Sequence, residues 1–238
     1  MKTICLCRQK KTNMKVLLLE GLDNVGKSSI ASELMLRFKD KYNILFMHSR
    51  SPMQENVDPL TYQSVEFYMK ADTAAHMAIY EECKDTYIPE NNKHPLSETL
   101  CIFDRSWLDE YVYGQIYREE PLWEILLMIT NCFEALMQPG VMLEKMQVAI
   151  VYLDSTPEFS IYKDDGRSFT SDIENYTKKL DIVKREYALF NEVCNYCKEN
   201  NLCDTVKVNV QTSDTEYKPI GNIVGEIETE LNKIGITL

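Results

Sequence analysis

The sequence predicts a three-layer α/β fold in which helices flank a five-stranded parallel sheet. Five short apolar segments alternate with helical stretches, which is typical of parallel strands joined by right-handed crossovers. The first and fourth segments are nearly continuous runs of Val, Ile and Leu, as expected of strands buried on both faces. The predicted strands are 15–20, 42–48, 99–104, 147–154 and 206–210.

Helical stretches separate these strands. The long stretch 171–200 carries apolar or aromatic residues at a spacing of three to four, which predicts an amphipathic helix packed on the sheet. These residues are Ile173, Tyr176, Leu180, Val183, Tyr187 and Phe190. The other predicted helical stretches are 27–41, 60–86, 108–118, 120–137 and 220–233.

Composition indicates an ordinary globular chain with an acidic surface. It has 238 residues, 45% of them hydrophobic, and a net charge of −11. An acidic surface disfavours extended nucleic acid but leaves room for one small anion in a local basic pocket. No apolar run is long enough to cross a membrane, so we predict no membrane partner and a cytoplasmic protein. We expect residues 1–13 to form a flexible extension and 14–238 a single domain.

Eight cysteines occur in the chain. In a cytoplasmic protein of this size they are expected to be reduced and mostly buried. A zinc site at Cys194, Cys197 and Cys203 is the alternative interpretation, although the second Cys-x-x-Cys pair of a zinc ribbon is missing.

A glycine-rich segment after the first predicted strand matches the pattern G-x-x-x-x-G-K-S/T. Gly21 and Gly26 allow backbone angles that aim N–H groups at phosphate oxygens, and the following helix adds its positive end. Lys27 is expected to reach the β- and γ-phosphates, and Ser28 to bind Mg²⁺. We therefore predict a P-loop NTPase fold that binds ATP. The expected ATP contacts are Gly21, Asn24, Val25, Gly26, Lys27, Ser28 and Ser29.

An Asp–Arg pair ends the third predicted strand. Asp104 would lie at the carboxyl edge of the sheet, where ligands bind in such folds, and can hold Mg²⁺ directly or through water. Arg105 can clamp an acceptor phosphate with its planar guanidinium. A surface pair that caps the next helix is the alternative interpretation.

These motifs together resemble the thymidylate kinase-like family of P-loop nucleoside and nucleotide kinases. The resemblance implies ATP, Mg²⁺ and a homodimer, and the segment 110–114 is similar to one in many phage-type kinases of this group. Some members carry a catalytic arginine in the phosphate loop and others in a lid. Because this loop has no arginine, the resemblance points to Arg167 in a lid near 160–172, with Lys163 as second choice. The resemblance is carried by Asp23 and by residues 50–52, 104–105, 113–115 and 152–158.

The resemblance also implies an acceptor site. Arg50 and Arg105 would hold the acceptor phosphate. The family's thymine-stacking aromatic falls on Met69 here and its base-binding arginine on Thr73, which implies a rebuilt base pocket. The acceptor is therefore thymidylate, another pyrimidine nucleotide or a modified one, while helix packing explains Tyr68 and Met69 equally well. The expected acceptor-binding residues are Arg50, Tyr68, Met69, Asp72, Thr73, Arg105, Tyr113 and Gln115.

The predicted activity is phosphoryl transfer from ATP to a (deoxy)nucleoside monophosphate. We expect Lys27, Asp23, Arg105 and Arg167 to be catalytic, with no general base, because an acceptor phosphate is already ionised. A deoxynucleoside kinase, which phosphorylates a neutral hydroxyl, is the first alternative. A non-catalytic nucleotide-binding module is the second. The acidic balance disfavours a polynucleotide kinase, and no N/T-K-x-D motif supports a GTPase.

Overall fold

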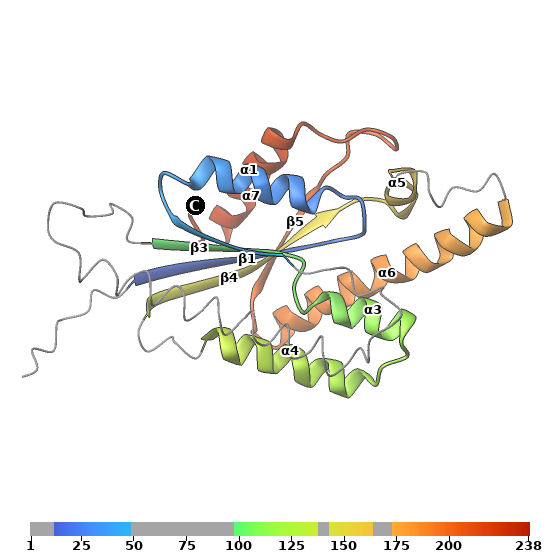
Figure 1. Ribbon diagram of the computed structural model, residues 1–238, viewed down its shortest axis with the longest axis horizontal. Helices are drawn as coiled ribbons and strands as arrows, with labels where there is room; N and C mark the ends of the chain where they lie inside the picture. Colours follow the sequence, from blue (N-terminus) through green and yellow to red (C-terminus); the bar gives the residue numbers. More distant parts are fainter. Residues whose placement is uncertain (1–11, 49–97, 138–142, 164–172) are drawn as a thin grey trace, which may run out of the picture.

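The fold is taken from a computed structural model, which describes residues 12–48, 98–137, 143–163 and 173–238. A central sheet lies between two layers of helices (Figure 1). This arrangement confirms the predicted three-layer α/β fold. The predicted extension 1–13 lies almost wholly outside the described residues, and so do the predicted helix 60–86 and most of the predicted lid.

The sheet has five strands in the order β2-β3-β1-β4-β5, and every neighbouring pair is parallel. Parallel pairing brings all carboxyl ends to one edge, where the phosphate loop begins. The five predicted strands are therefore confirmed, with ends that move by a few residues. Their bounds are β1 (Thr12–Glu20), β2 (Asn43–His48), β3 (Glu98–Asp104), β4 (Leu143–Asp154) and β5 (Asp204–Asn209).

Helices cover both faces of the sheet. In Figure 1, α1 and α7 lie on one face and α3, α4 and α6 on the other. A further short helix, α5, follows β4. The bounds are α1 (Lys27–Phe38), α3 (Asp109–Tyr117), α4 (Leu122–Met137), α5 (Pro157–Tyr162), α6 (Ile173–Glu199) and α7 (Ile220–Lys233).

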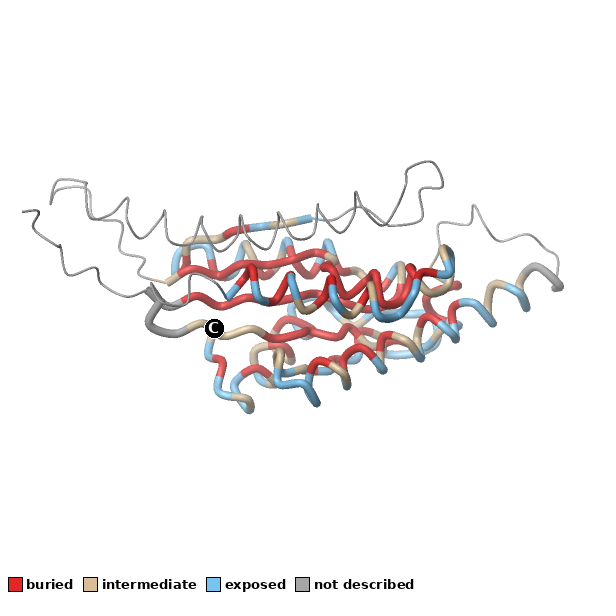
Figure 2. The backbone as a smooth tube through the Cα atoms, turned by 90° about the horizontal axis from the view of Figure 1, so that it is seen from below, coloured by how far each residue is buried: buried red, intermediate tan, exposed pale blue. Residues whose placement is uncertain are grey.

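Burial follows the apolar pattern of the sequence. The central strand β1 is buried from Met14 to Glu20, and Figure 2 shows the buried residues running along the middle strands. On α6, Val183 and Phe190 are buried against the core, as the helical spacing predicts. The strand therefore ends in a carboxylate, Glu20, that has no exposure to solvent.

Two expectations need correction. The predicted helix 27–41 ends at Phe38, because the chain turns there and the N–H groups of Lys41 and Tyr42 both bond to its carbonyl oxygen. Helix α5 was not expected; Thr156 caps it by accepting a hydrogen bond from the Phe159 N–H.

The cysteines in the described part of the chain are free thiols, and all but Cys203 are buried. Within the described ranges, no group of three or more His, Cys, Asp or Glu residues is arranged to hold a metal ion. No helix among them is long and apolar enough to cross a membrane.

Candidate active site

The phosphate loop connects β1 to α1 with a backbone that demands glycine at two positions. Gly21 has φ 141°, and a Cβ atom there would lie 2.6 Å from the carbonyl oxygen of Leu153 on β4. Gly26 has φ 89° and stands directly before α1. The loop can therefore press against β4 and turn into the helix only with these residues.

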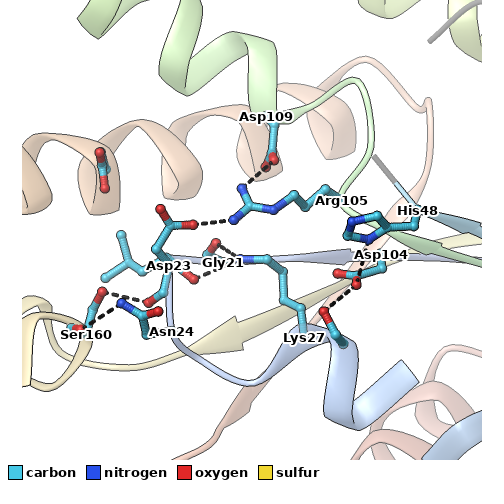
Figure 3. A network of polar contacts seen from close by, with 12 residues as sticks. Gly21, Asp23, Asn24, Lys27, His48, Asp104, Arg105, Asp109 and Ser160 are labelled. Atoms are coloured by element: carbon cyan, nitrogen blue, oxygen red, sulfur yellow. Dashed lines mark hydrogen bonds and ion pairs between the residues drawn. The ribbon is translucent and has the colours of Figure 1, made fainter. Parts of the chain in front are cut away.

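Lys27 is the buried cation of the loop (Figure 3). Its Nζ donates hydrogen bonds to the carbonyl oxygens of Gly21 at 2.6 Å and Leu22 at 2.8 Å. Burial and the nearby Arg105 lower the pKa of Lys27, while Asp23 acts in the opposite direction. The amine is thus held at the centre of the loop, the place where a triphosphate needs a positive charge.

The remaining loop residues divide between the core and the surface. Val25 is buried, whereas Ser28 and Ser29 are exposed in the first turn of α1. Asn24 adopts a left-handed backbone (φ 60°), and its carbonyl oxygen accepts a hydrogen bond from the Tyr217 hydroxyl. The loop is therefore held partly by the segment that precedes α7.

A cluster of three side chains joins α1 to the ends of β2 and β3. Ser28 Oγ donates a hydrogen bond to Asp104 Oδ2 at 2.6 Å, and His48 Nδ1 lies 3.0 Å from the same oxygen. Oxygen ligands of this kind suit Mg²⁺, so Ser28 and Asp104 fit the predicted metal site. The sequence did not indicate His48, which reaches Asp104 only because β2 and β3 pair in register at these two residues.

Arg105 is fixed by two carboxylates from different elements. Its Nη1 donates to Asp109 Oδ2 on α3 at 3.1 Å, and its Nη2 donates to Asp23 Oδ1 in the phosphate loop (Figure 3). Burial opposes the charge, but Asp109 and Asp23 raise the pKa of Arg105 above its usual value. The guanidinium is a permanent cation held in one orientation next to the loop.

The two carboxylates that hold Arg105 differ in their setting. Burial opposes ionisation of Asp23, but Arg105 and then Lys27 lower its pKa below the ordinary value. Asp109 is almost fully buried and leaves its Oδ1 without a hydrogen-bond partner among the described residues. Asp109 was not expected at the site.

Glu20 lies beneath the loop and was also not expected there. Its Oε1 accepts hydrogen bonds from the backbone N–H of Ser106, at 3.0 Å, and from the Ser106 hydroxyl. Its Oε2 has no partner in the described part of the chain. Burial, followed by the effect of Asp109, raises the pKa of Glu20 well above its ordinary value.

Helix α3 turns one of its two predicted base-binding residues toward the site. Tyr113 is fully buried and stacks on Tyr117 with ring centroids 6.0 Å apart, and its pKa is raised by burial and by Asp23. Gln115 lies two positions further on, on a different face of the helix, and its Nε2 donates to the Tyr111 carbonyl oxygen at 2.5 Å. The structure therefore brings Tyr113, but not Gln115, toward Asp23.

Helix α6 contributes a buried carboxyl group to the same region. Glu186 Oε1 accepts a hydrogen bond from the Tyr117 hydroxyl at 2.6 Å. Burial raises the pKa of Glu186 to about 7. The charge of Asp23 also raises this pKa, whereas that of Lys27 lowers it. No motif in the sequence marked this residue.

The predicted lid and acceptor residues lie mostly outside the described ranges. Lys163, the second choice for the lid cation, is an exception: its Nζ lies 4.7 Å from the centroid of the Tyr217 ring. The predicted residues outside the described ranges are Arg50, Tyr68, Met69, Asp72, Thr73 and Arg167.

No family model matches this chain, and no curated protein matches it in sequence. One similar solved structure is a deoxyadenosine kinase from M. mycoides with the products dCMP and a flexible dCDP bound. It is 16% identical to this chain, and the match covers 93% of this chain and 100% of that chain with a TM-score of 0.42. The YorR protein from Bacillus subtilis, in complex with phosphorylated GDP, is 16% identical over 92% of this chain and 98% of that chain, with a TM-score of 0.47.

Proposed function

We propose that this chain transfers the γ-phosphate of ATP to a (deoxy)nucleoside monophosphate. One observation carries the proposal: two fixed cations, Lys27 and Arg105, both lie beside Asp23 at the carboxyl edge of the sheet (Figure 3). Phosphoryl transfer depends chiefly on positioning and on stabilising charge, and both need such cations.

Each part of the loop has a role in this reaction. The N–H groups of the loop and the amine of Lys27 would bind the ATP phosphates, and Gly26, where an added Cβ would meet nothing within 4 Å, leaves room for close approach. Ser28 and Asp104 would hold Mg²⁺, which neutralises phosphate charge when bound. Arg105 would bind the phosphate of the acceptor with its planar guanidinium.

The charge state of the loop carboxylate supports a monophosphate acceptor. A nucleoside acceptor attacks through a neutral hydroxyl and needs a general base with a pKa near the working pH. The pKa of Asp23 is lowered by Arg105 and Lys27, which makes Asp23 a poor proton acceptor. A nucleotide phosphate is already ionised and needs no base.

A deoxynucleoside kinase is the second candidate, and Glu186 favours it. Its pKa of about 7 is suited to a general base, and it lies within electrostatic range of Asp23 and Lys27. Phosphorylation of a nucleoside would therefore assign the proton transfer to Glu186. A non-catalytic nucleotide-binding module remains the third candidate.

The finer assignments rest on residues outside the described ranges. We propose thymidylate, another pyrimidine nucleotide or a modified one as the acceptor, with Arg50 on its phosphate. Arg167 would close over the transferred group. A homodimer and a cytoplasmic location belong to the same proposal.

ADP formation from ATP and Mg²⁺ with a panel of nucleosides and nucleotides tests this function. We expect turnover with monophosphates only. Arg105→Ala should raise the acceptor KM about 10- to 100-fold, the loss expected for charged hydrogen bonds, with ATP binding measured by calorimetry within about twofold of wild type. A melting curve for Arg105→Ala checks that the variant is folded.

Other outcomes of the panel separate the candidates. Turnover with nucleosides that is lost in Glu186→Gln would replace the monophosphate proposal with the deoxynucleoside kinase. ATP binding without turnover on any acceptor would favour the binding module.

A further inference from the structure

Two carboxyl groups meet beneath the phosphate loop, Glu20 from β1 and Asp109 from α3. Glu20 is 0% exposed and Asp109 is 1% exposed. One oxygen of each is occupied: Glu20 Oε1 by Ser106 and Asp109 Oδ2 by Arg105. The other two oxygens, Glu20 Oε2 and Asp109 Oδ1, receive no donor from the described residues.

One proton satisfies both of these oxygens. Two ionised carboxylates in a buried site repel each other and leave two acceptors unpaired, which is costly. If Glu20 is protonated, its Oε2–H donates to Asp109 Oδ1, and Asp109 keeps the charge that binds Arg105. The pKa of Glu20 agrees with this state, since burial, Asp109 and a hydrogen bond between the two side chains all raise it.

The described groups that act on Glu20 come from α3, from the turn before α3 and from α1. Asp109 of α3 favours the protonated form, while the Ser106 hydrogen bond and Lys27 of α1 oppose it. Cys194 of α6 also lies within electrostatic range of Glu20: burial raises the pKa of the Cys194 thiol, and Glu20 adds to this effect. Lys27 is not the missing donor in this structure: its amine donates to the Gly21 and Leu22 carbonyl oxygens, and Glu20 Oε2 receives no hydrogen bond from the described residues.

We propose that Glu20 is a positioning residue that keeps a proton, donates it in a hydrogen bond to Asp109, and thereby orients Arg105 for the acceptor. The contacts form one chain, from Glu20 through Asp109 and Arg105 to Asp23. The last link, to the acceptor phosphate, rests on the function proposed above. The earlier links depend only on the buried carboxyl pair.

Two variants of nearly equal size separate a protonated Glu20 from an ionised one. Glu20→Gln presents an amide N–H to Asp109 and a carbonyl oxygen to Ser106, so it mimics the protonated acid. Glu20→Met fills the same space without either hydrogen bond. We expect Glu20→Gln to keep the acceptor KM within about twofold of wild type and Glu20→Met to raise it about tenfold, with kcat affected less.

The pH profile gives a readout that packing alone does not change. In the wild type the acceptor KM should rise at alkaline pH, because an ionised Glu20 repels Asp109 and loosens Arg105. In Glu20→Gln this rise should be absent. A Glu20→Gln variant as defective as Glu20→Met would overturn the proposal, since it would mean that the ionised carboxylate is required.

A measurement without substrate distinguishes this proposal from the proposed function. The infrared difference spectrum, wild type minus Glu20→Gln at neutral pH, should contain the C=O band of a protonated carboxyl group. Absence of that band overturns the shared proton, whatever the activity. If the band is present but no acceptor is phosphorylated, the proton stands and the kinase proposal fails.

Discussion

Arg105 is the residue with the least usual backbone in the described site. It adopts φ 66°, a left-handed conformation that costs free energy for any residue other than glycine. Its N–H bonds to the Leu19 carbonyl oxygen of the neighbouring strand, and its guanidinium is bound at both ends by Asp23 and Asp109. The surroundings thus impose the strain and direct the side chain back over the phosphate loop.

Gly21 gives a sharp prediction at the same scale. Gly21→Ala should destabilise the protein by roughly 3 kcal/mol or more, because φ 141° disfavours a Cβ atom that would also lie 2.6 Å from the Leu153 carbonyl oxygen. Gly225→Ala is the matched control: Gly225 lies inside α7 with nothing within 4 Å of the added Cβ. The control should gain about 0.5–1 kcal/mol. Urea unfolding of both variants measures the difference; equal effects would contradict the strained loop.

Single residues were predictable where a motif fixes their neighbours along the chain. Lys27, Ser28 and Asp104 follow from local patterns, and the structure brings them together as expected. The role of Glu20 does not follow from a local pattern, because its partner Ser106 is 86 positions away in the sequence. Only the pairing of β1 with β3 brings the two residues together. A charged residue directly after the apolar run 16–19 was the available signal.

Among the elements, α5 shows how a short helix can support the loop. Ser160 Oγ donates to the Asp23 carbonyl oxygen at 2.7 Å, and the Ser160 carbonyl oxygen accepts from Asn24 Nδ2 at 3.4 Å. With six residues, α5 is too short for a hydrophobic period to be detected. Its sequence signal is confined to the N-terminus, where Thr156 caps the helix and a proline follows.

Removing this cap should weaken both the helix and the loop that it supports. Thr156→Ala should cost about 1 kcal/mol of stability and raise the KM for ATP severalfold, because α5 holds the backbone of Asp23 and Asn24. Thr229→Ala is the control, since Thr229 is exposed inside α7 and binds only its own helix, at Gly225. Thermal melting and ATP titration of the two variants test this. A Thr156→Ala protein with wild-type ATP affinity would show that α5 does not support the loop.

Across the elements, type and order were predictable, and ends were less so. The apolar runs fixed five strands, yet β4 begins at Leu143 rather than 147 and β5 ends at Asn209 rather than 210. Strand ends depend on pairing with neighbouring strands. β4 begins early because the whole of β1, from Thr12 to Glu20, finds partners on it, starting at Leu143. Local residue preferences do not contain that information.

For the whole molecule, the sheet divides the site into two sides. Asp104 is in register with Leu19 of β1 and His48 of β2, so its side chain shares their face, beside Ser28 of α1. Glu20, one residue further along, points to the opposite face, toward Asp109 of α3. The residues proposed to hold Mg²⁺ and the residues that support Arg105 therefore lie on opposite faces of the same edge, and the phosphate loop passes between them.

The α3–α6 side of the molecule buries three carboxyl groups with raised pKa values. Burial raises the pKa of Glu110 to about 8 and that of Glu186 to about 7, from an ordinary value of 4.5, and raises that of Glu20 well above it. At pH values between its unfolded and its folded pKa, each group is protonated in the folded protein and ionised in the unfolded chain. Each therefore contributes stability that is complete below its unfolded pKa and is lost as the pH rises through its folded pKa.

The free energy of unfolding should consequently fall between about pH 5 and pH 8, with a slope of at most about 1.4 kcal/mol per pH unit for each group. Asp23 acts in the opposite sense. Because its pKa is lowered in the folded state, it contributes stability at pH values above its ordinary pKa of 3.8, and this stability is lost as the pH falls further. Maximum stability should thus lie near pH 5, which urea unfolding at a series of pH values measures.

Two variants test which group causes the fall in stability. Glu186→Gln should flatten the plot of unfolding free energy against pH up to about pH 7. Glu199→Gln, at an exposed position at the end of α6, should leave the shape of the plot unchanged. A free energy of unfolding that rises across this interval would mean that the buried carboxyl groups are ionised in the folded protein.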